Sequence, residues 1–273
     1  MDTLTNSLSE NQRTLDTLLG VGRNYDVINR DLYVGSRKGR LYVIDGYGDD
    51  GVIERIISFL LGRGGDLAAE AADMQDFIDR CVTFCEVDCE NNVDKVLKGA
   101  FIGKTILLLE GFDYCAMIDA KQFPGRSVEE PSDGKVLRGS HDGFTETMVQ
   151  NTALLRRRIR DTHLTLESHQ VGGRSRTDVV LAYMDNQADP KDLEELRRKL
   201  EQIDVGSIAM SQESVAEAIV KPQWYNPFPK VRYTERPDTA TACIMEGSIV
   251  LLVHNSLSVM IMPTSLLDFM EEA

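Results

Sequence analysis

Apolar and polar residues in the first half of the chain follow two rhythms, one with a period of two and one with a helical period. The period of two predicts strands, and apolar residues at spacings of three and four predict helices. In chain order, the expected elements are a short leading helix within 1–24, strands at 31–35 and 40–45, helices at 52–61 and 66–79, a β-prone run at 82–87, a helix at 93–101, and a hairpin of strands at 104–109 and 114–118.

The second half repeats much of this order. GKTILLLEGFDYCAMID from Gly103 matches GSIVLLVHNSLSVMIMP from Gly247 at an offset of 144 residues, and the first strands, from Asp31 and His163, are offset by 132. The expected elements are strands at 163–166 and 178–183, helices at 189–202 and 211–219, an extended strap at 226–238, and a closing hairpin of strands at 248–253 and 259–262.

These similar offsets predict an α/β protein with two similar small α/β subdomains, each a mixed sheet with helices on its faces. The alternative is a pair of unrelated α/β halves. We expect the first subdomain at 1–124, a linker and connecting helix at 125–160, and the second subdomain at 161–273.

The linker combines turn-forming residues with a helix. Its first half lacks an apolar period, and its second half predicts a helix from Gly143 to Arg160 with Asp142 as the N-cap. Four arginines lie near the end of this helix, where they either meet a phosphate, a lipid head group or an acidic partner, or only balance the surrounding acidic charge. The apolar stripe expected on the helix consists of Phe144, Met148, Leu155 and Ile159.

The composition and net charge of the chain argue against several classes of function. The chain has 273 residues, 42% of them hydrophobic, and a net charge of −14, which argues against binding to nucleic acid or to an anionic membrane surface. The amino terminus has no secretory signal pattern. The longest uncharged run, 247–267, contains His254 and Pro263, so a strand hairpin is expected there rather than a membrane-spanning helix.

The cysteines and histidines predict neither a metal site nor a catalytic site. An odd count of five cysteines indicates a reduced compartment. Cys81, Cys85 and Cys89 are evenly spaced, but no histidine lies nearby and the spacing matches no common zinc or cluster motif. The chain also lacks HExxH and GxSxG motifs, so we expect no enzyme activity.

A GxGxxG sequence, GYGDDG at 46–51, lies between an expected strand and an expected helix. This is the context of a dinucleotide-binding turn. However, Asp49 and Asp50 occupy the place where a pyrophosphate needs uncharged amide donors, and two carboxylates there would repel it. We therefore expect no cofactor.

Two longer motifs carry a resemblance to a known family. RSVEEPSDGKVLRGSHDGFTETMVQNTALLRRRIR at 126–160 resembles the motif of the A subunits of bacterial spore germinant receptors. PFPKVRYTERPD at 227–238, followed by EGSIVLLVHNSLSVMIMP from Glu246, resembles a second motif of that family. Taken together, residues 24–45 and the second motif are most similar to the stage V sporulation branch of this family.

The resemblance implies a cellular setting. Family members normally continue into a helical membrane domain, and this chain ends at Ala273, about where that domain would begin. The resemblance therefore implies membrane attachment only through the missing C-terminal domain, at the spore inner membrane, with this part on the cytoplasmic (spore core) side. It also implies other spore membrane germination proteins as partners, a homo-oligomer in the full-length protein, and a complex that promotes ion release during germination.

Two classes of function remain. The first is a non-catalytic signalling and assembly domain, in which the segment at 126–160 sets the relative angle of the subdomains or only stabilises the fold. The second is a small-molecule-sensing module with its ligand in the cleft between the subdomains. The candidate interface and hinge residues are Arg126, Glu130, Pro131, Arg138, Gly139, Asp142, Gly143, Phe144, Glu146, Asn151, Arg156, Arg158, Pro229, Thr234, Glu235, Arg236, Pro237 and Asp238.

Overall fold

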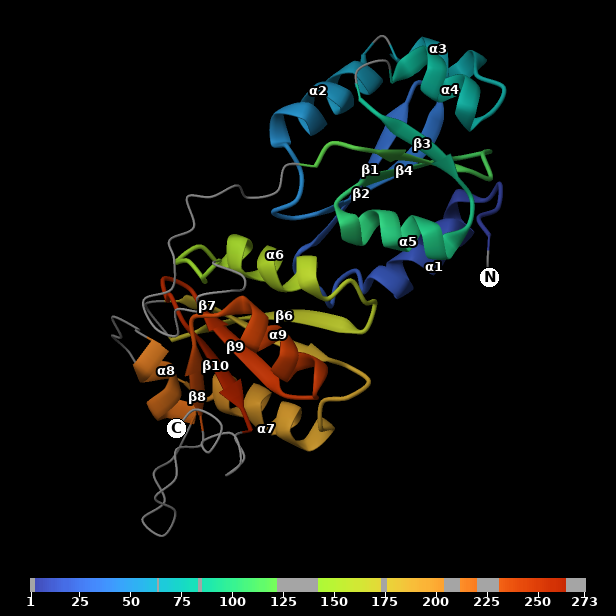
Figure 1. Cartoon of the computed structure of the whole chain (residues 1–273). Helices are drawn as coiled ribbons and strands as arrows, with labels where there is room; N and C mark the ends of the chain where they lie inside the picture. The colour runs from blue at the N-terminus through green and yellow to red at the C-terminus, as the bar shows by residue number, and fades with distance from the viewer. Residues whose placement is uncertain are drawn as a thin grey trace. The chain divides into compact units, whose positions relative to one another are not determined.

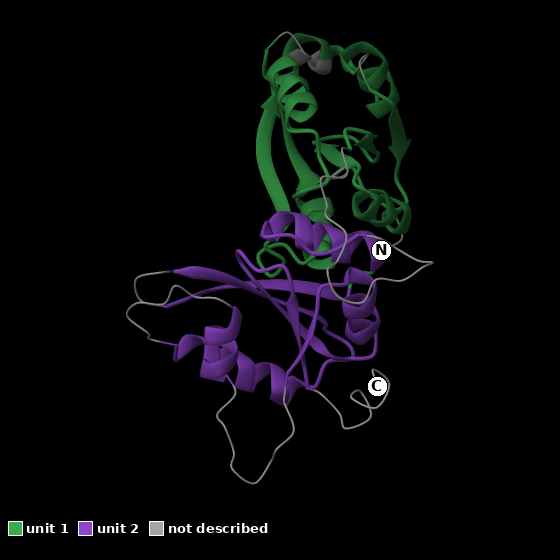
Figure 2. Ribbon diagram, turned by 60° about the vertical axis from the view of Figure 1, so that its left-hand side comes forward, with its two compact units in different colours: residues 1–125, 160–162 green, residues 126–159, 163–273 purple. Residues whose placement is uncertain are grey.

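The computed structural model describes residues 3–62, 64–82, 85–121, 142–172, 176–203, 212–219 and 231–263 (Figure 1). The chain divides into two compact units, the first formed by residues 1–125 with 160–162 and the second by residues 126–159 with 163–273 (Figure 2). Each unit has its own sheet and its own hydrophobic core.

The first unit is built on a five-stranded sheet of order β1-β2-β4-β5-β3, whose paired neighbours are antiparallel. All five residues of β4 are buried, because helices cover both faces of the sheet at this central strand. The strands are β1 (Val27–Val34), β2 (Arg37–Ile44), β3 (Val87–Glu90), β4 (Thr105–Leu109) and β5 (Cys115–Ile118).

The helices of the first unit lie on opposite faces of this sheet (Figure 1). On one face, α2 (Asp50–Leu61), α3 (Gly64–Glu70) and α4 (Met74–Cys81) close a core with Leu41 and Leu107. On the other face lie α1 (Leu8–Leu19) and α5 (Val93–Ile102), which pack on each other and on β2 and β4.

The second unit repeats this plan with a sheet of order β6-β7-β9-β10-β8, again with antiparallel neighbours. Helices α7 and α8 close the core on one face, and α6 and α9 pack on the other. In chain order the elements are α6 (Met148–Arg158), β6 (Leu164–Val171), β7 (Thr177–Met184), α7 (Pro190–Glu201), α8 (Gln212–Ile219), β8 (Arg232–Thr234), α9 (Pro237–Met245), β9 (Ile249–Val253) and β10 (Val259–Met262).

The prediction of two similar α/β units is confirmed, and the likeness extends to single hydrogen bonds. Leu4 N–H donates to the Asn91 carbonyl at 2.8 Å in the first unit. Phe144 N–H donates to the Glu235 carbonyl at 3.0 Å in the second, at offsets of 140 and 144 residues. Equivalent backbone contacts at equivalent places indicate two copies of one fold rather than two unrelated halves.

The two copies differ in charge at one helical position. Asp16 on α1 accepts hydrogen bonds from Arg40 (2.8 Å) and from the Tyr42 hydroxyl (2.8 Å). The equivalent residue on α6, at an offset of 140, is Arg156, which is fully buried. The same place in the fold therefore holds a carboxylate in one unit and a guanidinium in the other.

The sheets differ from the prediction in one respect, because the described strand pairs are antiparallel and not mixed. The chain forms the hairpins β1–β2, β4–β5, β6–β7 and β9–β10, and a hairpin joins only antiparallel neighbours. The closing hairpin lies where the sequence placed it, and Asn255 takes a positive φ of 62° in its turn.

Other boundaries differ as well, and the strands expected at 31–35 and 163–166 are longer as β1 and β6. The single helix expected at 66–79 is two helices, because the Asp73 carboxylate accepts a hydrogen bond from Asp76 N–H at 2.8 Å and starts α4 anew. The β-prone run at 82–87 becomes a strand only from Val87. The strap expected at 226–238 contains β8 and ends in the first turn of α9, which Pro237 begins; residues 226–230 lie outside the described residues.

The helix expected within the linker at 125–160 is grouped with the second unit, since α6 packs against α9 and β9. Among the described residues, no helix combines the length and apolar character needed to cross a membrane.

Candidate interface site at helices α6 and α9

A buried asparagine holds the backbone segment that precedes helix α6. Asn151, only 1% exposed, accepts a hydrogen bond from Thr145 N–H at 2.7 Å and donates to the Thr145 carbonyl. The helix begins at Met148 with Thr147 as the N-cap residue, so the expected start at Gly143 with Asp142 as N-cap is wrong. Asn151 does not cap the helix; it bonds both backbone groups of Thr145, two residues before the N-cap.

Asp142 instead pairs with the other end of the helix. Its carboxylate accepts a hydrogen bond from Arg158 at 2.6 Å, and Arg158 also donates to the Leu154 carbonyl at 3.1 Å. Because Thr145 contacts the first turns and Asp142 the last turn, the segment 142–147 runs alongside α6. The ion pair is about four-fifths buried on each side, where solvent screens it less than on an open surface.

The arginines at the end of α6 are not equivalent. Arg156 is fully buried and donates to the Leu164 carbonyl at 3.5 Å, whereas Arg157 is exposed. Burial of a guanidinium is tolerated only when its donors are paired. Arg156 therefore belongs to the interior of the second unit and is not available to an acidic partner. The predicted stripe of Phe144, Met148, Leu155 and Ile159 is buried.

The second motif forms the start of α9. Arg236 donates to the Asp238 carboxylate at 3.0 Å, and Arg236 N–H donates to the Thr234 hydroxyl at 3.2 Å. The hydrogen bond from Arg236 outweighs partial burial and lowers the pKa of Asp238, and the charge of Arg158 adds to this effect. A carboxylate in the first turn also suits the positive end of the helix dipole.

The two motifs meet, although about ninety residues separate them in sequence. Phe144 N–H donates to the Glu235 carbonyl at 3.0 Å, and helices α6 and α9 pack side by side. The Glu146 carbonyl accepts a hydrogen bond from Asn255 N–H at 3.1 Å, which ties the closing hairpin to the same place. We call these contacting residues the α6–α9 cluster: Asp142, Phe144, Glu146, Asn151, Arg158, Thr234, Glu235, Arg236, Pro237 and Asp238.

The remaining sequence candidates fall into two groups. Gly143 is buried beside the cluster, and Arg156 lies in the interior. The others lie outside the described residues: Arg126, Glu130, Pro131, Arg138, Gly139 and Pro229.

The GxGxxG turn serves the fold of the first unit. The Asp49 carboxylate accepts a hydrogen bond from Val52 N–H at 3.1 Å and caps α2, and Asp49 N–H donates to the Ala120 carbonyl at 2.8 Å. A Cβ added at Gly48 would lie 2.5 Å from Ile53 Cδ1, so a larger residue there would require the end of the Ile53 side chain to move. These contacts occupy the groups that a pyrophosphate would need.

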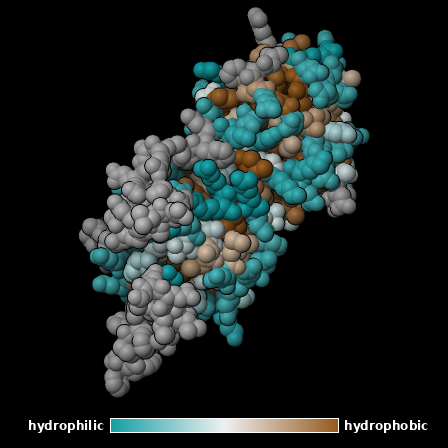
Figure 3. Space-filling view, viewed as in Figure 1, coloured by the Kyte–Doolittle hydropathy of each residue, from teal (hydrophilic) through white to brown (hydrophobic). Residues whose placement is uncertain are grey.

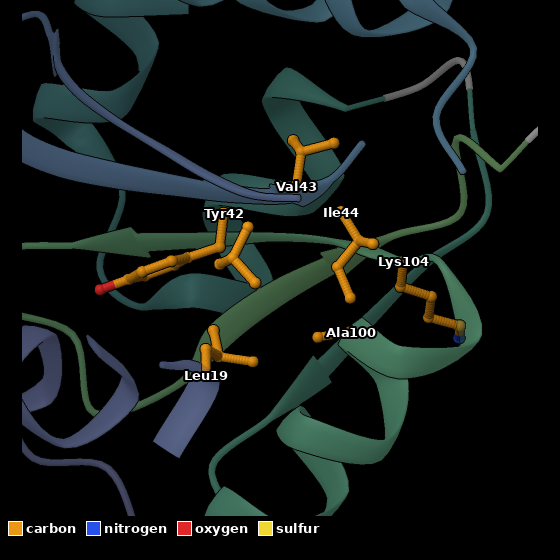
Figure 4. Close-up of a pocket in the computed structure, with 7 residues that line it drawn as sticks. Leu19, Tyr42, Val43, Ile44, Ala100 and Lys104 are labelled. Carbon is orange, nitrogen blue, oxygen red and sulfur yellow. The ribbon is translucent and has the colours of Figure 1, made fainter. Parts of the chain in front are cut away.

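A small hollow between α1, α5 and β2 is lined by Leu19, Tyr42, Ile44 and Ala100 (Figure 4). It has no room for a water molecule, so it is packed core and not a ligand site. Within the described ranges, no group of histidine, cysteine or acidic side chains is arranged to hold a metal ion. Burial raises the pKa of the Cys89 thiol to about 11, which makes it a poor nucleophile.

The second unit contains a polar network that was not predicted from the sequence. The Glu167 carboxylate accepts hydrogen bonds from Arg197 (2.7 Å), the Tyr183 hydroxyl (3.0 Å) and His169 (2.8 Å). Burial alone would raise the pKa of Glu167, but these hydrogen bonds outweigh it and lower the pKa to about 2. Alternate polar residues on β6 gave a weak signal of a polar face, but their partners are distant in sequence.

The sequence pattern of the Bacillus/Clostridium GerA spore germination protein family matches residues 14–273. The chain is 36% identical over 265 residues to stage V sporulation protein AF of Bacillus subtilis, covering 97% of this chain and 53% of that protein. It is 27% identical to spore germination protein KA of the same organism, covering 94% of this chain and 47% of that protein. The chain thus spans about half the length of these relatives.

A solved structure has the same fold. The crystal structure of the N-terminal domain of the A subunit of the Bacillus megaterium spore germinant receptor GerK3 superposes with a TM-score of 0.73 at 26% identity. The match covers 96% of this chain and 97% of that one. The match includes the α6–α9 cluster and all but the first 13 residues of the chain, so the chain belongs to the Bacillus/Clostridium GerA spore germination protein family.

Proposed function

We propose that this domain is a signalling and assembly domain of a spore inner-membrane germination protein. It lies on the cytoplasmic (spore core) side and forms part of an oligomeric complex that promotes ion release during germination. Family membership supports the germination role. The names of the relatives, which include spore germination proteins KA and B1, support partners of the same class.

The observation that carries this proposal is the convergence of the two family-like motifs on the α6–α9 cluster. The first unit also brings the equivalent places together, through Leu4 and Asn91, but it has Leu18 and Asn92 where the second unit has Arg158 and Arg236. The Arg158–Asp142 and Arg236–Asp238 pairs give the cluster directional, charge-assisted bonds. Such bonds hold one geometry and resist deformation.

The cluster is also joined to the end of the fold. Thr234 on β8 pairs with Val259 on β10, and β10 ends at Met262. In relatives about twice as long, a displacement at α6 and α9 would pass through β8 and β10 toward the rest of the polypeptide. A small shift in a packed, hydrogen-bonded cluster transmits well because such a cluster is not continuously deformable.

The test uses the full-length protein in spores and two matched substitutions, Asn151→Ala and Asn11→Ala. Both remove the same helix-head hydrogen bonds, one in the cluster and one at the equivalent place in the first unit. We expect Asn151→Ala to slow ion release and germination more than Asn11→Ala at equal protein levels. Equal effects of the two substitutions would show that the cluster only stabilises the fold.

A further inference from the structure

At the outer edge of the second unit, an ion pair joins helix α7 to the sheet. Where α7 crosses the edge strand β6, Glu167 on β6 pairs with Arg197 on α7 at 2.7 Å, and Tyr183 on β7 bonds both. Each polar group at this seam has a partner within the same unit. A seam satisfied in this way offers little to another protein.

The same place in the first unit is apolar except for Arg30, which stands where Glu167 does. The positions equivalent to Tyr183 and Arg197, at an offset of 140, are Val43 on β2 and Ile57 on α2. Both are half-buried and pack against the core. Figure 4 shows Val43 on the opposite side of β2 from Tyr42 and Ile44, which places it on the face that α2 covers.

Helices α2 and α7 show which apolar residues the fold requires. Both begin after an aspartate N-cap, and both turn three aliphatic residues at matching positions toward the core: Ile53, Ile56 and Leu60 in α2, and Leu193, Leu196 and Leu200 in α7. At two further matching positions α7 has Arg197 and Glu201 where α2 has Ile57 and Leu61. The fold therefore does not need apolar residues at these two places.

Part of this apolar seam is open to solvent. Leu61 at the end of α2 is 56% exposed, and Ile28 on β1, the cross-strand partner of Val43, is 48% exposed. The equivalent of Ile28 in the second unit is Thr165, which is buried. Figure 3 shows brown, hydrophobic surface among the hydrophilic surface of the first unit. We call Ile28, Val43, Ile57 and Leu61 the β1–α2 seam.

We propose that the β1–α2 seam docks an apolar protein segment flanked by basic side chains. On the same side of α2 as Ile57 and Leu61 lie the carboxylates of Asp50 and Glu54, which outnumber Arg30 on β1. The chain as a whole carries a charge of −14. A second copy of the chain or an anionic lipid surface would meet like charge here, whereas a basic segment gains attraction at the rim of an apolar contact.

The experiment measures fluorescence anisotropy of a labelled amphipathic Leu/Lys peptide with the whole chain. The test variant is Ile28→Thr/Leu61→Glu, which installs the residues that the second unit has at the equivalent places. It adds one negative charge, so electrostatics alone would strengthen binding of a basic peptide. The control variant, Leu257→Thr/Met245→Glu, makes the same chemical change at residues of the second unit that are 50% and 56% exposed.

We expect the wild type and the control to bind the Leu/Lys peptide alike and the test variant to bind it roughly tenfold more weakly. A matching Leu/Glu peptide should not bind. Equal binding by the test variant, or no binding by the wild type, overturns the proposal. So does self-association of the wild type that the test variant abolishes, or binding to phosphatidylcholine–phosphatidylglycerol vesicles in place of the peptide. This proposal concerns the first unit, so it can fail while the spore assay on Asn151 succeeds.

Discussion

Asn11 and Asn151 make equivalent side-chain hydrogen bonds in the two units. Asn11 accepts a hydrogen bond from Thr5 N–H at 2.9 Å and donates to the Thr5 carbonyl at 2.6 Å. Asn151 makes the same pair of bonds with Thr145. Both side chains are buried, so each holds the backbone ahead of its helix without help from water.

Replacing either asparagine by alanine should therefore destabilise its own unit by about 1–3 kcal/mol, because two partly buried backbone groups lose their partners. Urea unfolding with hydrogen exchange would measure the loss in each unit. Asn6→Ala, next to Thr5 but outside the pair of bonds, is the control and should change the free energy of unfolding by less than about 0.5 kcal/mol. A matching loss in the control would contradict the role assigned to Asn11.

The Glu167 network predicts a pH dependence. The pKa of Glu167 is about 2 in the folded protein, below its ordinary value of 4.5. The ionised carboxylate therefore stabilises the fold above about pH 4.5, and this stability is lost as the pH falls toward 2. After allowance for solvent screening, the contribution is about 1–2 kcal/mol.

Glu167→Gln should consequently lower the free energy of unfolding at pH 7, and the difference from the wild type should shrink between pH 4.5 and 2. Urea titrations at several pH values would show this. Glu194→Gln removes a carboxylate that is 3.7 Å from the same Arg197 but largely exposed, and it should have little effect. A constant difference across the pH range would argue against the assignment.

The buried arginine of α6 should be far more sensitive than its neighbour. Arg156→Ala leaves a cavity and removes the donor to the Leu164 carbonyl, so we expect a loss of about 3 kcal/mol or more. Arg157→Ala changes an exposed side chain and should stay within about 0.5 kcal/mol. Thermal and urea unfolding would compare the two, and similar losses would place Arg156 at the surface instead.

Substitutions at two glycines with positive φ should distinguish the cost of backbone strain from the cost of steric overlap. A Cβ at Gly35 (φ 62°) would lie 2.2 Å from the Gly65 carbonyl oxygen, whereas a Cβ at Gly22 (φ 83°) would meet nothing within 4 Å. Gly22→Ala should cost about 1 kcal/mol from strain alone. Gly35→Ala should cost clearly more, because β1–β2 and α3 must move apart. Equal losses in urea unfolding would mean that the two elements separate easily.

Much of the fold could be predicted because its signals are local. The continuous apolar run of β4 and the helical period of α7 can be seen in neighbouring residues of the sequence. The similarity of the segment from Gly103 to the segment from Gly247 indicated the duplication. The start of α6 could not be predicted from residue type, since Asp142 is as good an N-cap as Thr147 by composition. The shared T-x-[ST]-x-x-x-N pattern at 5–11 and 145–151 was the missed signal.

The candidate site was predictable in its residues but not in its geometry. The two motifs indicated Asp142, Arg158 and Asp238 as polar groups of interest, yet pairing between distant residues leaves no local pattern. Burial was equally hidden, because Arg156 and Arg157 are adjacent and identical in type but only one points inward. Such contacts depend on the packing of α6 against the sheet, which only the folded chain defines.

A polypeptide with two copies of one fold must keep a helix of one copy from settling on the sheet of the other while it folds. The opposite charges of Asp16 and Arg156 discourage that exchange. If α1 docked in place of α6, the Asp16 carboxylate would face Val180 and Ala182, which stand where Arg40 and Tyr42 provide donors in the first unit. A desolvated carboxylate without donors is strongly disfavoured, so this charge inversion favours each helix on the sheet of its own unit.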